Sequence, residues 1–281
     1  MALFPSFASV QYYTVFVTVL LLWFGTGRQP LGAAYGFVRS LVISRKSLMF
    51  FAALIAILQV NKNELWFESK YGVQYDLTSV LTGWEGNWHA QLQRLFHSGF
   101  VTDITAFFYI VVFQSVMIAS IGIYTYRKDM KLFYAFCVAL LVNYIVAVPM
   151  YWFVPVNEAW YANPHIHFLM LEAFPTFETN YRGLSGLNNC FPSLHTSISV
   201  TMALIAARSG IRRWAVFAWV NAVVIIFSIF YLGIHWFTDM AAGLVLAWGS
   251  AAVGFKVGAW AERHRDASPA KSDNEIADVR I

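Results

Sequence analysis

The chain has 281 residues, of which 59% are hydrophobic, 18% aromatic and only 12% charged. Soluble domains carry roughly 25% charged residues, so this composition and a mean hydropathy of +0.56 exclude a soluble globular domain. A chain this apolar is not disordered either, because it can bury more than enough surface. Two cysteines, Cys137 and Cys190, are too few for a disulfide scaffold or a multi-cysteine zinc site. We therefore expect an all-α integral membrane protein.

Seven apolar runs approach the length of about 20 residues that a membrane-spanning helix needs. The segment before the first run has no lysine or arginine, so we interpret that run as a retained helix and not as a secretory signal. The fifth run extends upstream through Pro192, which suits a first helical turn. We predict a transmembrane bundle of six or seven helices. The runs cover residues 10–25, 45–60, 100–126, 132–154, 195–208, 213–234 and 236–260.

The basic residues divide unequally between alternate loops. Of the 19 lysines and arginines, all but Lys62, Lys70, Arg94 and Arg182 fall on one side. The positive-inside rule places that richer side in the cytoplasm, together with the C-terminus. The two long loops, residues 61–99 and 156–191, then lie outside. Since this rule explains the net charge of +4, we expect no nucleic-acid partner.

Three parts of the chain follow from this topology. Residues 1–99 would form N-terminal membrane helices and an outer amphipathic segment, residues 100–260 a catalytic membrane bundle, and residues 261–281 a disordered cytoplasmic tail. In the outer segment, apolar side chains recur at helical spacing, which predicts either an amphipathic helix in the outer interface or a lid packed on the bundle. These side chains are Trp84, Trp88, Leu92, Leu95 and Phe96.

Two histidines stand at the predicted outer ends of membrane helices, where ionisable residues are costly and therefore functional suspects. His195 lies in the run F-P-S-L-H-T-S, and His235 begins the run H-W-F-T-D. Asp239 follows His235 at i,i+4 and can fix its tautomer, which leaves the second ring nitrogen as a nucleophile or base. Ser193 is a predicted N-cap, and the free N–H groups of the first turn beyond it would suit a phosphate.

A structural interpretation of these residues competes with the catalytic one. A single histidine in a membrane is often an interhelical hydrogen-bonding residue, and a His–Asp pair alone is structural about as often as it is functional. Two histidines at one membrane face, one followed by an aspartate and the other preceded by Pro-Ser, favour phosphoryl transfer.

The paired motifs resemble those of the type-2 phosphatidic acid phosphatase superfamily of membrane lipid phosphatases and phosphotransferases. The pattern is P-S-x-H, followed 40 residues later by H-x-x-x-D. Leu194 stands where the phosphatases usually carry Gly, and F-P-S-L-H-T-S and V-P-V-N-E-A-W-Y are closer to the inositol phosphorylceramide synthase branch. The resemblance extends from about Phe100 to Trp260. The matching residues are Pro192, Ser193, His195, His235 and Asp239.

The resemblance implies a role for each catalytic residue. His195 would be the general acid, His235 the nucleophile that forms a phosphohistidine, and Asp239 the residue that orients it. No metal or other cofactor is implied, and we see no carboxylate cluster to hold a metal. The partners implied are a membrane phospholipid donor and a lipid or water acceptor.

The chain also departs from the phosphatase pattern in its cations. The upstream K-x6-R-P motif is missing, and Ser228 is followed by Ile229 where the third motif has Arg. Arg182 is the candidate substitute phosphate ligand, with a solvated loop residue as the equal alternative. A phosphomonoester carries about −1.5 to −2 charges and a phosphodiester one, so a site poor in cations favours a phosphodiester lipid.

Several further residues have two interpretations each. Asn188 and Asn189 could bind head-group hydroxyls or form a turn. Tyr231, one turn before His235, faces the site or packs in the bundle. We assign Cys190 no catalytic role, because its thiol has no base nearby in the sequence. His165 and His167 form an H-x-H pattern with too few ligands for a metal site.

Two other classes of function compete with a phosphotransferase. The intramembrane His and Asp residues could relay protons in a transporter, but the charged residues gather at one face and do not thread the membrane. His195 and His235 could be axial haem ligands, but such ligands usually come from within spans. The main alternative within the enzyme class is a phosphatase that hydrolyses phosphomonoester lipids.

Overall fold

The computed structural model describes residues 2–63, 66, 70 and 75–264, and these residues are helical apart from turns and one isolated bridge between Val156 and Asn189. Five helical segments are long and apolar enough to cross a membrane, and a bent pair makes up to six. The prediction of an all-α polytopic membrane bundle is confirmed. The five are α1 (Phe7–Thr26), Gly99–Tyr126, α9 (Met130–Phe153), α15 (Arg212–Tyr231) and α16 (Phe237–Arg263).

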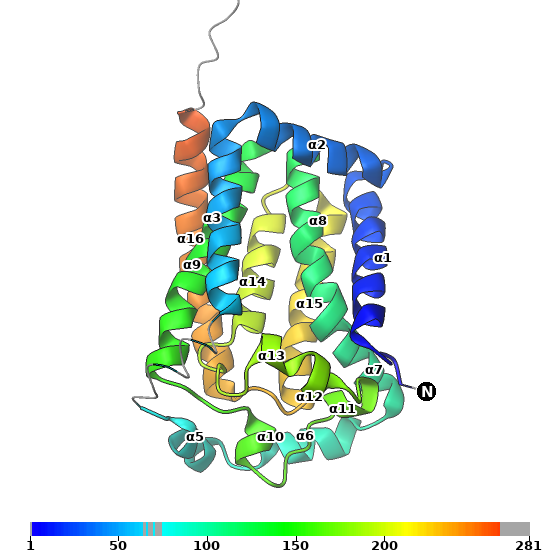
Figure 1. Ribbon diagram of the computed structural model, residues 1–281, viewed down its shortest axis with the longest axis vertical. Helices are drawn as coiled ribbons and strands as arrows, with labels where there is room; N and C mark the ends of the chain where they lie inside the picture. Colours follow the sequence, from blue (N-terminus) through cyan, green and yellow to red (C-terminus); the bar gives the residue numbers. More distant parts are fainter. Residues whose placement is uncertain (1, 64–65, 67–69, 71–74, 265–281) are drawn as a thin grey trace, which may run out of the picture.

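The bent pair corrects the second predicted span. Helix α3 (Arg45–Lys62) is the expected run, but the connection before it is also a helix, α2 (Pro30–Ile43), set at 107° to α3. Figure 1 shows α2 lying across the end of the bundle. Pro30 occupies the first turn of α2, and the extended residue Ser44 ends α2 and caps α3 by accepting the Ser47 N–H.

The long loops gather at the opposite end of the bundle from α2, beside the chain's N-terminus (Figure 1). Both hold short helices, and the second loop leads into α14 (Leu194–Ala206), the shorter apolar helix at the fifth predicted run. Most of the predicted tail, residues 265–281, lies outside the described residues. The short helices are α5 (Thr78–Glu85), α6 (Trp88–Phe96), α10 (Ala159–Ala162), α11 (Met170–Ala173), α12 (Phe177–Asn180) and α13 (Arg182–Ser185).

The span Gly99–Tyr126 contains an irregularity that the sequence pattern did not indicate. Between α7 (Gly99–Phe107) and α8 (Phe113–Tyr126), residues Phe108–Val112 form a π-helical turn. Such turns rotate the following side chains and are frequent at functional sites. Here the turn carries Tyr109, whose ring stacks on that of His195 with 4.0 Å between centroids.

Small residues allow α16 to approach its neighbours closely. A Cβ added at Gly243 would lie 2.7 Å from the Ser193 carbonyl oxygen, and one at Gly254 would lie 2.5 Å from the Ala135 carbonyl oxygen. Such small-residue contacts are typical of helix packing in membranes. The contact at Gly243 sets the distance between the starts of α14 and α16, which carry the two histidine motifs.

We expect Gly243→Ala to lower the thermal unfolding midpoint of the purified protein, because overpacking against a backbone oxygen costs about 1–3 kcal/mol. Gly249→Ala is the matched control on the same helix, since a Cβ there meets nothing within 4 Å. Its midpoint should stay the same or rise, because alanine favours a helix over glycine by about 1 kcal/mol. Equal midpoints for the two variants would show that the Gly243 contact is not tight.

Candidate active site

The two histidines come from different segments of the chain and face one cavity. His195 is in the first turn of α14, and His235 lies in the turn between α15 and α16; their ring centroids are 6.2 Å apart. Both side chains line a cavity of about 360 Å³ that also receives Tyr109, Glu158 and Asn189. The structure therefore brings together the two histidines that the span count placed at one end.

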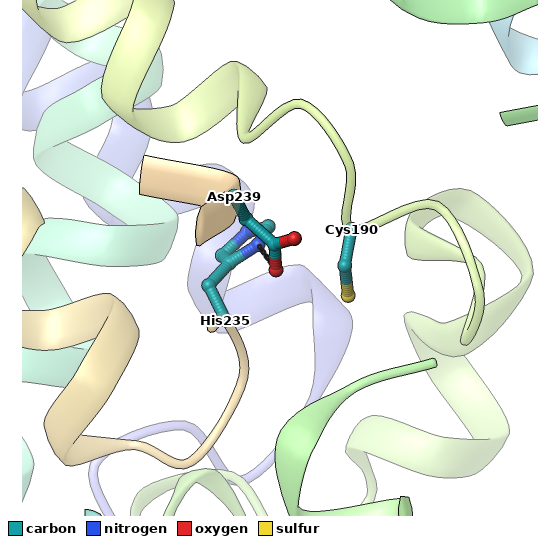
Figure 2. Close-up of side chains that lie close together, drawn as sticks. All are labelled: Cys190, His235 and Asp239. Atoms are coloured by element: carbon teal, nitrogen blue, oxygen red, sulfur yellow. Dashed lines mark hydrogen bonds and ion pairs between the residues drawn. The ribbon is translucent and has the colours of Figure 1, made fainter. Parts of the chain in front are cut away.

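Asp239 lies behind His235 and is fully buried. Its Oδ2 accepts the Trp236 backbone N–H at 2.9 Å and lies 3.4 Å from Nδ1 of His235. Asp239 thus serves both the N-terminus of α16 and the imidazole ring. The arrangement leaves Nε2 of His235 free of the carboxylate. Figure 2 shows His235 and Asp239 together, with Cys190 beside them.

The sequence analysis gave Cys190 no role, but the structure places it in the same group. One donor atom each from Cys190, His235 and Asp239 lie within 4.8 Å of one another. The thiol lies 3.7 Å from the Ile234 carbonyl oxygen. Burial raises the pKa of this thiol well above its usual value, and the carboxylates of Asp239 and Glu158 raise it further. The residue is therefore a neutral thiol beside the candidate nucleophile.

Arg182 is held by carboxylates. Its Nε and Nη2 donate to Glu178 at 2.9 and 2.7 Å, and its Nη1 donates to Glu158 at 2.8 Å and to the Gly186 carbonyl at 2.6 Å. It is absent from the residues that line the cavity. Arg182 is thus largely buried and paired with two carboxylates, and its role as a phosphate ligand stays a prediction.

Glu158, the acidic residue of the run V-P-V-N-E-A-W-Y, lines the cavity. Burial raises the pKa of its carboxyl, and the Arg182 guanidinium acts in the opposite direction. Among the described residues that line the cavity there is no lysine or arginine, while Glu158 supplies a carboxyl group. The cavity is therefore poor in positive charge, as the missing family cations predicted.

Of the other predicted binding residues, only Asn189 is among the residues that line the cavity. Asn189 lines the cavity, and the Pro192 carbonyl accepts the Tyr151 hydroxyl at 3.1 Å. Ser193 is buried and caps α14, with its Oγ accepting the Thr196 N–H at 3.3 Å. Tyr231 does not line the cavity, and its hydroxyl pairs with that of Thr102 at 2.8 Å, so packing in the bundle is the interpretation that the geometry favours.

The outer amphipathic segment is two helices, α5 and α6, because Gly86 adopts a positive φ of 62° and breaks it. Three polar side chains of this segment contact the turn that carries His235. Glu85 accepts the N–H groups of Phe237 and Thr238 at 2.6 and 2.8 Å. We call Glu85, His89 and Gln93 the outer clamp.

The rest of the outer clamp contacts the same turn. Nε2 of His89 lies 2.9 Å from the His235 carbonyl oxygen, and Gln93 donates to the Tyr231 carbonyl at 2.9 Å. Burial lowers the pKa of His89, which favours a neutral ring that donates from Nε2. These residues recur every four positions, but only His89 and Gln93 share a helical face, because Gly86 separates α5 from α6. The segment packs on the bundle as the lid alternative described.

The comparisons with known proteins agree with the motifs. A family profile of the PAP2 superfamily matches residues 76–253, a range that includes the outer clamp, both histidines and Asp239. No curated protein and no solved structure gives a significant match to the chain. Since the profile covers more than half of the sequence, the chain belongs to the PAP2 superfamily and is a phosphatase-type enzyme of the membrane.

Proposed function

We propose that the protein is a lipid phosphotransferase that moves a phospho-head group from a phosphodiester lipid to an acceptor hydroxyl, supplied by a lipid or by water. One observation carries the proposal: two imidazole rings meet 6.2 Å apart across one cavity, with a carboxylate behind His235 and no basic side chain among the described lining residues. Family membership supports the broader class of phosphatase-type lipid enzymes.

The proposed reaction has two steps. In the first, Nε2 of His235 attacks phosphorus as the bond to the leaving alcohol breaks, and protonated His195 donates its proton to the leaving oxygen. In the second, His195 takes the proton of the acceptor hydroxyl, whose oxygen displaces His235 from phosphorus. Asp239 holds the His235 ring and balances its positive charge in both steps.

The phosphate oxygens need donors other than basic side chains. The first-turn N–H groups of α14, at Leu194 and His195, have no acceptor within their own helix and sit at its positive end. In this proposal they bind the phosphate, while Arg182 acts indirectly by holding Glu158. Tyr109 supports the His195 ring by stacking on it at 18° between ring planes.

The charge of the cavity supports a phosphodiester donor. A monoester would bring about −1.5 to −2 charges against Glu158 with no basic side chain to balance them, whereas a diester brings one. The resemblance of F-P-S-L-H-T-S to the inositol phosphorylceramide synthase branch supports the same substrate class. Hydrolysis of phosphomonoester lipids is the second candidate, and the superfamily match favours it.

The placement of the bases supports an active site on the outer side of the membrane. The end of the bundle that holds α2 and the C-terminus of α16 carries the base-rich connections, whereas α16 begins, directly after His235, at the other end (Figure 1). By the positive-inside rule the C-terminus would then be cytoplasmic.

We expect His195→Ala and His235→Ala each to lower kcat by several orders of magnitude, because acid and nucleophile act as a unit. Turnover of a phosphodiester lipid by purified protein is the measurement. His97→Ala is the control, since His97 lies at the same end but is exposed and paired with Glu172. Near-normal turnover in both alanine variants would rule out this mechanism.

We expect phosphodiester lipids to be consumed much faster than phosphatidic acid, because the cavity offers no basic side chain to a dianion. A panel of phospholipids, with and without ceramide or diacylglycerol, followed by mass spectrometry of the products, measures both donor and acceptor. Rapid phosphate release from phosphatidic acid, with no activity on diesters, would instead support the monoester phosphatase.

We expect Gln93→Ala and Glu85→Ala to lower kcat by about 10–100-fold with little change in KM, because a shift of about 1 Å in a reacting group can cost that much. Gln91→Ala is the control, since Gln91 is on the exposed side of the same helix. A change confined to KM, or equal effects of Gln91→Ala and Gln93→Ala, would show that the outer clamp does not position His235.

A further inference from the structure

Three different donor groups converge beside the cavity, and only two of them take part in the proposed reaction. Figure 2 shows the third, the thiol of Cys190, beside His235 and Asp239. We propose that Cys190, His235 and Asp239 form a binding site for a thiophilic divalent cation such as Zn²⁺, and that an ion bound there inhibits the enzyme. The binding half stands on geometry alone, whereas the inhibition rests on the proposed function.

The donor set fits zinc. Thiolate, imidazole and carboxylate are the ligands that proteins use for Zn²⁺, at about 2.3 Å for sulfur and 2.0–2.2 Å for nitrogen and oxygen. The three donor atoms here already lie within 4.8 Å of one another and belong to buried residues. Small side-chain rotations would bring them onto one ion. Mg²⁺ and Ca²⁺ prefer oxygen ligands, so the thiol makes the site selective for softer cations.

A buried carboxylate oxygen points independently to a missing partner. Oδ1 of Asp239 has no hydrogen-bond partner among the described residues, and Asp239 is 0% exposed. Leaving such an oxygen unsatisfied is costly. Oδ2 is already occupied by the Trp236 N–H. A cation held between Cys190 and His235 would satisfy Oδ1 without disturbing the cap of α16.

An ion that binds Cys190 must displace the proton of its thiol. On binding, the S–H bond breaks, the proton leaves to water and a sulfur–metal bond forms, with no change in oxidation state. Cys190 and His235 both line the cavity, so an ion can reach them by the substrate's own route.

Binding would remove the nucleophile from the proposed reaction. An imidazole whose lone pair is shared with a metal ion attacks phosphorus poorly, and an Asp239 that ligates the ion no longer balances the charge on His235. Inhibition should therefore depend on Cys190, although Cys190 itself has no step in the reaction.

Cobalt binding tests the proposed metal site, and zinc inhibition tests the effect of a bound ion on the reaction. The full-length protein, purified and freed of metal with a chelator, is titrated with Co²⁺, whose bond to a thiolate gives a charge-transfer band in the near ultraviolet. Wild type is compared with Cys190→Ser, His235→Ala and Cys137→Ser. Cys137 is the matched control, because it is a buried cysteine in α9 that lies outside the group.

We expect the cobalt band in wild type and Cys137→Ser and its loss in Cys190→Ser. With each rate normalised to the same variant's zinc-free rate, the zinc concentration for half inhibition should rise at least tenfold in Cys190→Ser and stay unchanged in Cys137→Ser. Mg²⁺ should not inhibit any of them.

Three results would overturn the proposal. These are no cobalt band in wild type, equal zinc inhibition of wild type and Cys190→Ser, or stimulation by zinc that requires Cys190. A band that requires Cys190 and weakens in His235→Ala, but comes without inhibition, would leave the metal site standing and would contradict His235 as the nucleophile, so a failure of the proposed function is distinguishable.

Discussion

The site depends on how a buried carboxylate, Asp239, is satisfied in an apolar bundle. An isolated buried charge is expensive, so it persists only with partners that compensate it. Asp239 finds them in the Trp236 N–H and the His235 ring, both within four residues. The same contacts cap α16 and orient the imidazole. The contacts of Asp239 that begin α16 are therefore the same contacts that hold the His235 ring in place.

The neighbouring elements extend this arrangement. Glu85 satisfies the next two N–H groups of α16, so that two carboxylates share the start of one helix. Gly243 lets α14 approach α16 closely enough for His195 to face His235. The π-helical turn places the ring of Tyr109 against the ring of His195. Each element adds a contact that limits how far the two imidazole rings can move apart.

The described residues that line the cavity include one carboxyl group and no lysine or arginine. Arg182, which pairs with the lining residue Glu158 and with Glu178, lies over the rings of Phe168 and Phe177. The cavity receives the carboxyl of Glu158 but not the guanidinium of Arg182. The N–H groups at the start of α14 are then the positive partners that remain for a phosphate group.

Much of the fold could be predicted, because hydrophobic runs mark the membrane helices. The alternation of these helices across the membrane also predicts that His195 and His235 lie at the same end. Seven runs place the starts of α14 and α16 at the same end. The sequence analysis did not predict α2, because a helix of this length is too short to span the membrane. It did not predict the π-helical turn either, because such a turn has no signature in hydropathy. The ion pairs of Arg182 and the position of Cys190 depend on contacts between distant loops, which residue spacing does not reveal.

The most direct test of the chemistry is covalent trapping. Purified enzyme is mixed with a phosphodiester lipid labelled at phosphorus, without acceptor, then quenched and digested for mass spectrometry. We expect the labelled phospho-head group on His235, with none in His235→Ala. Label on any other residue, or turnover by wild type with no covalent intermediate under conditions that trap it, would contradict nucleophilic attack by His235.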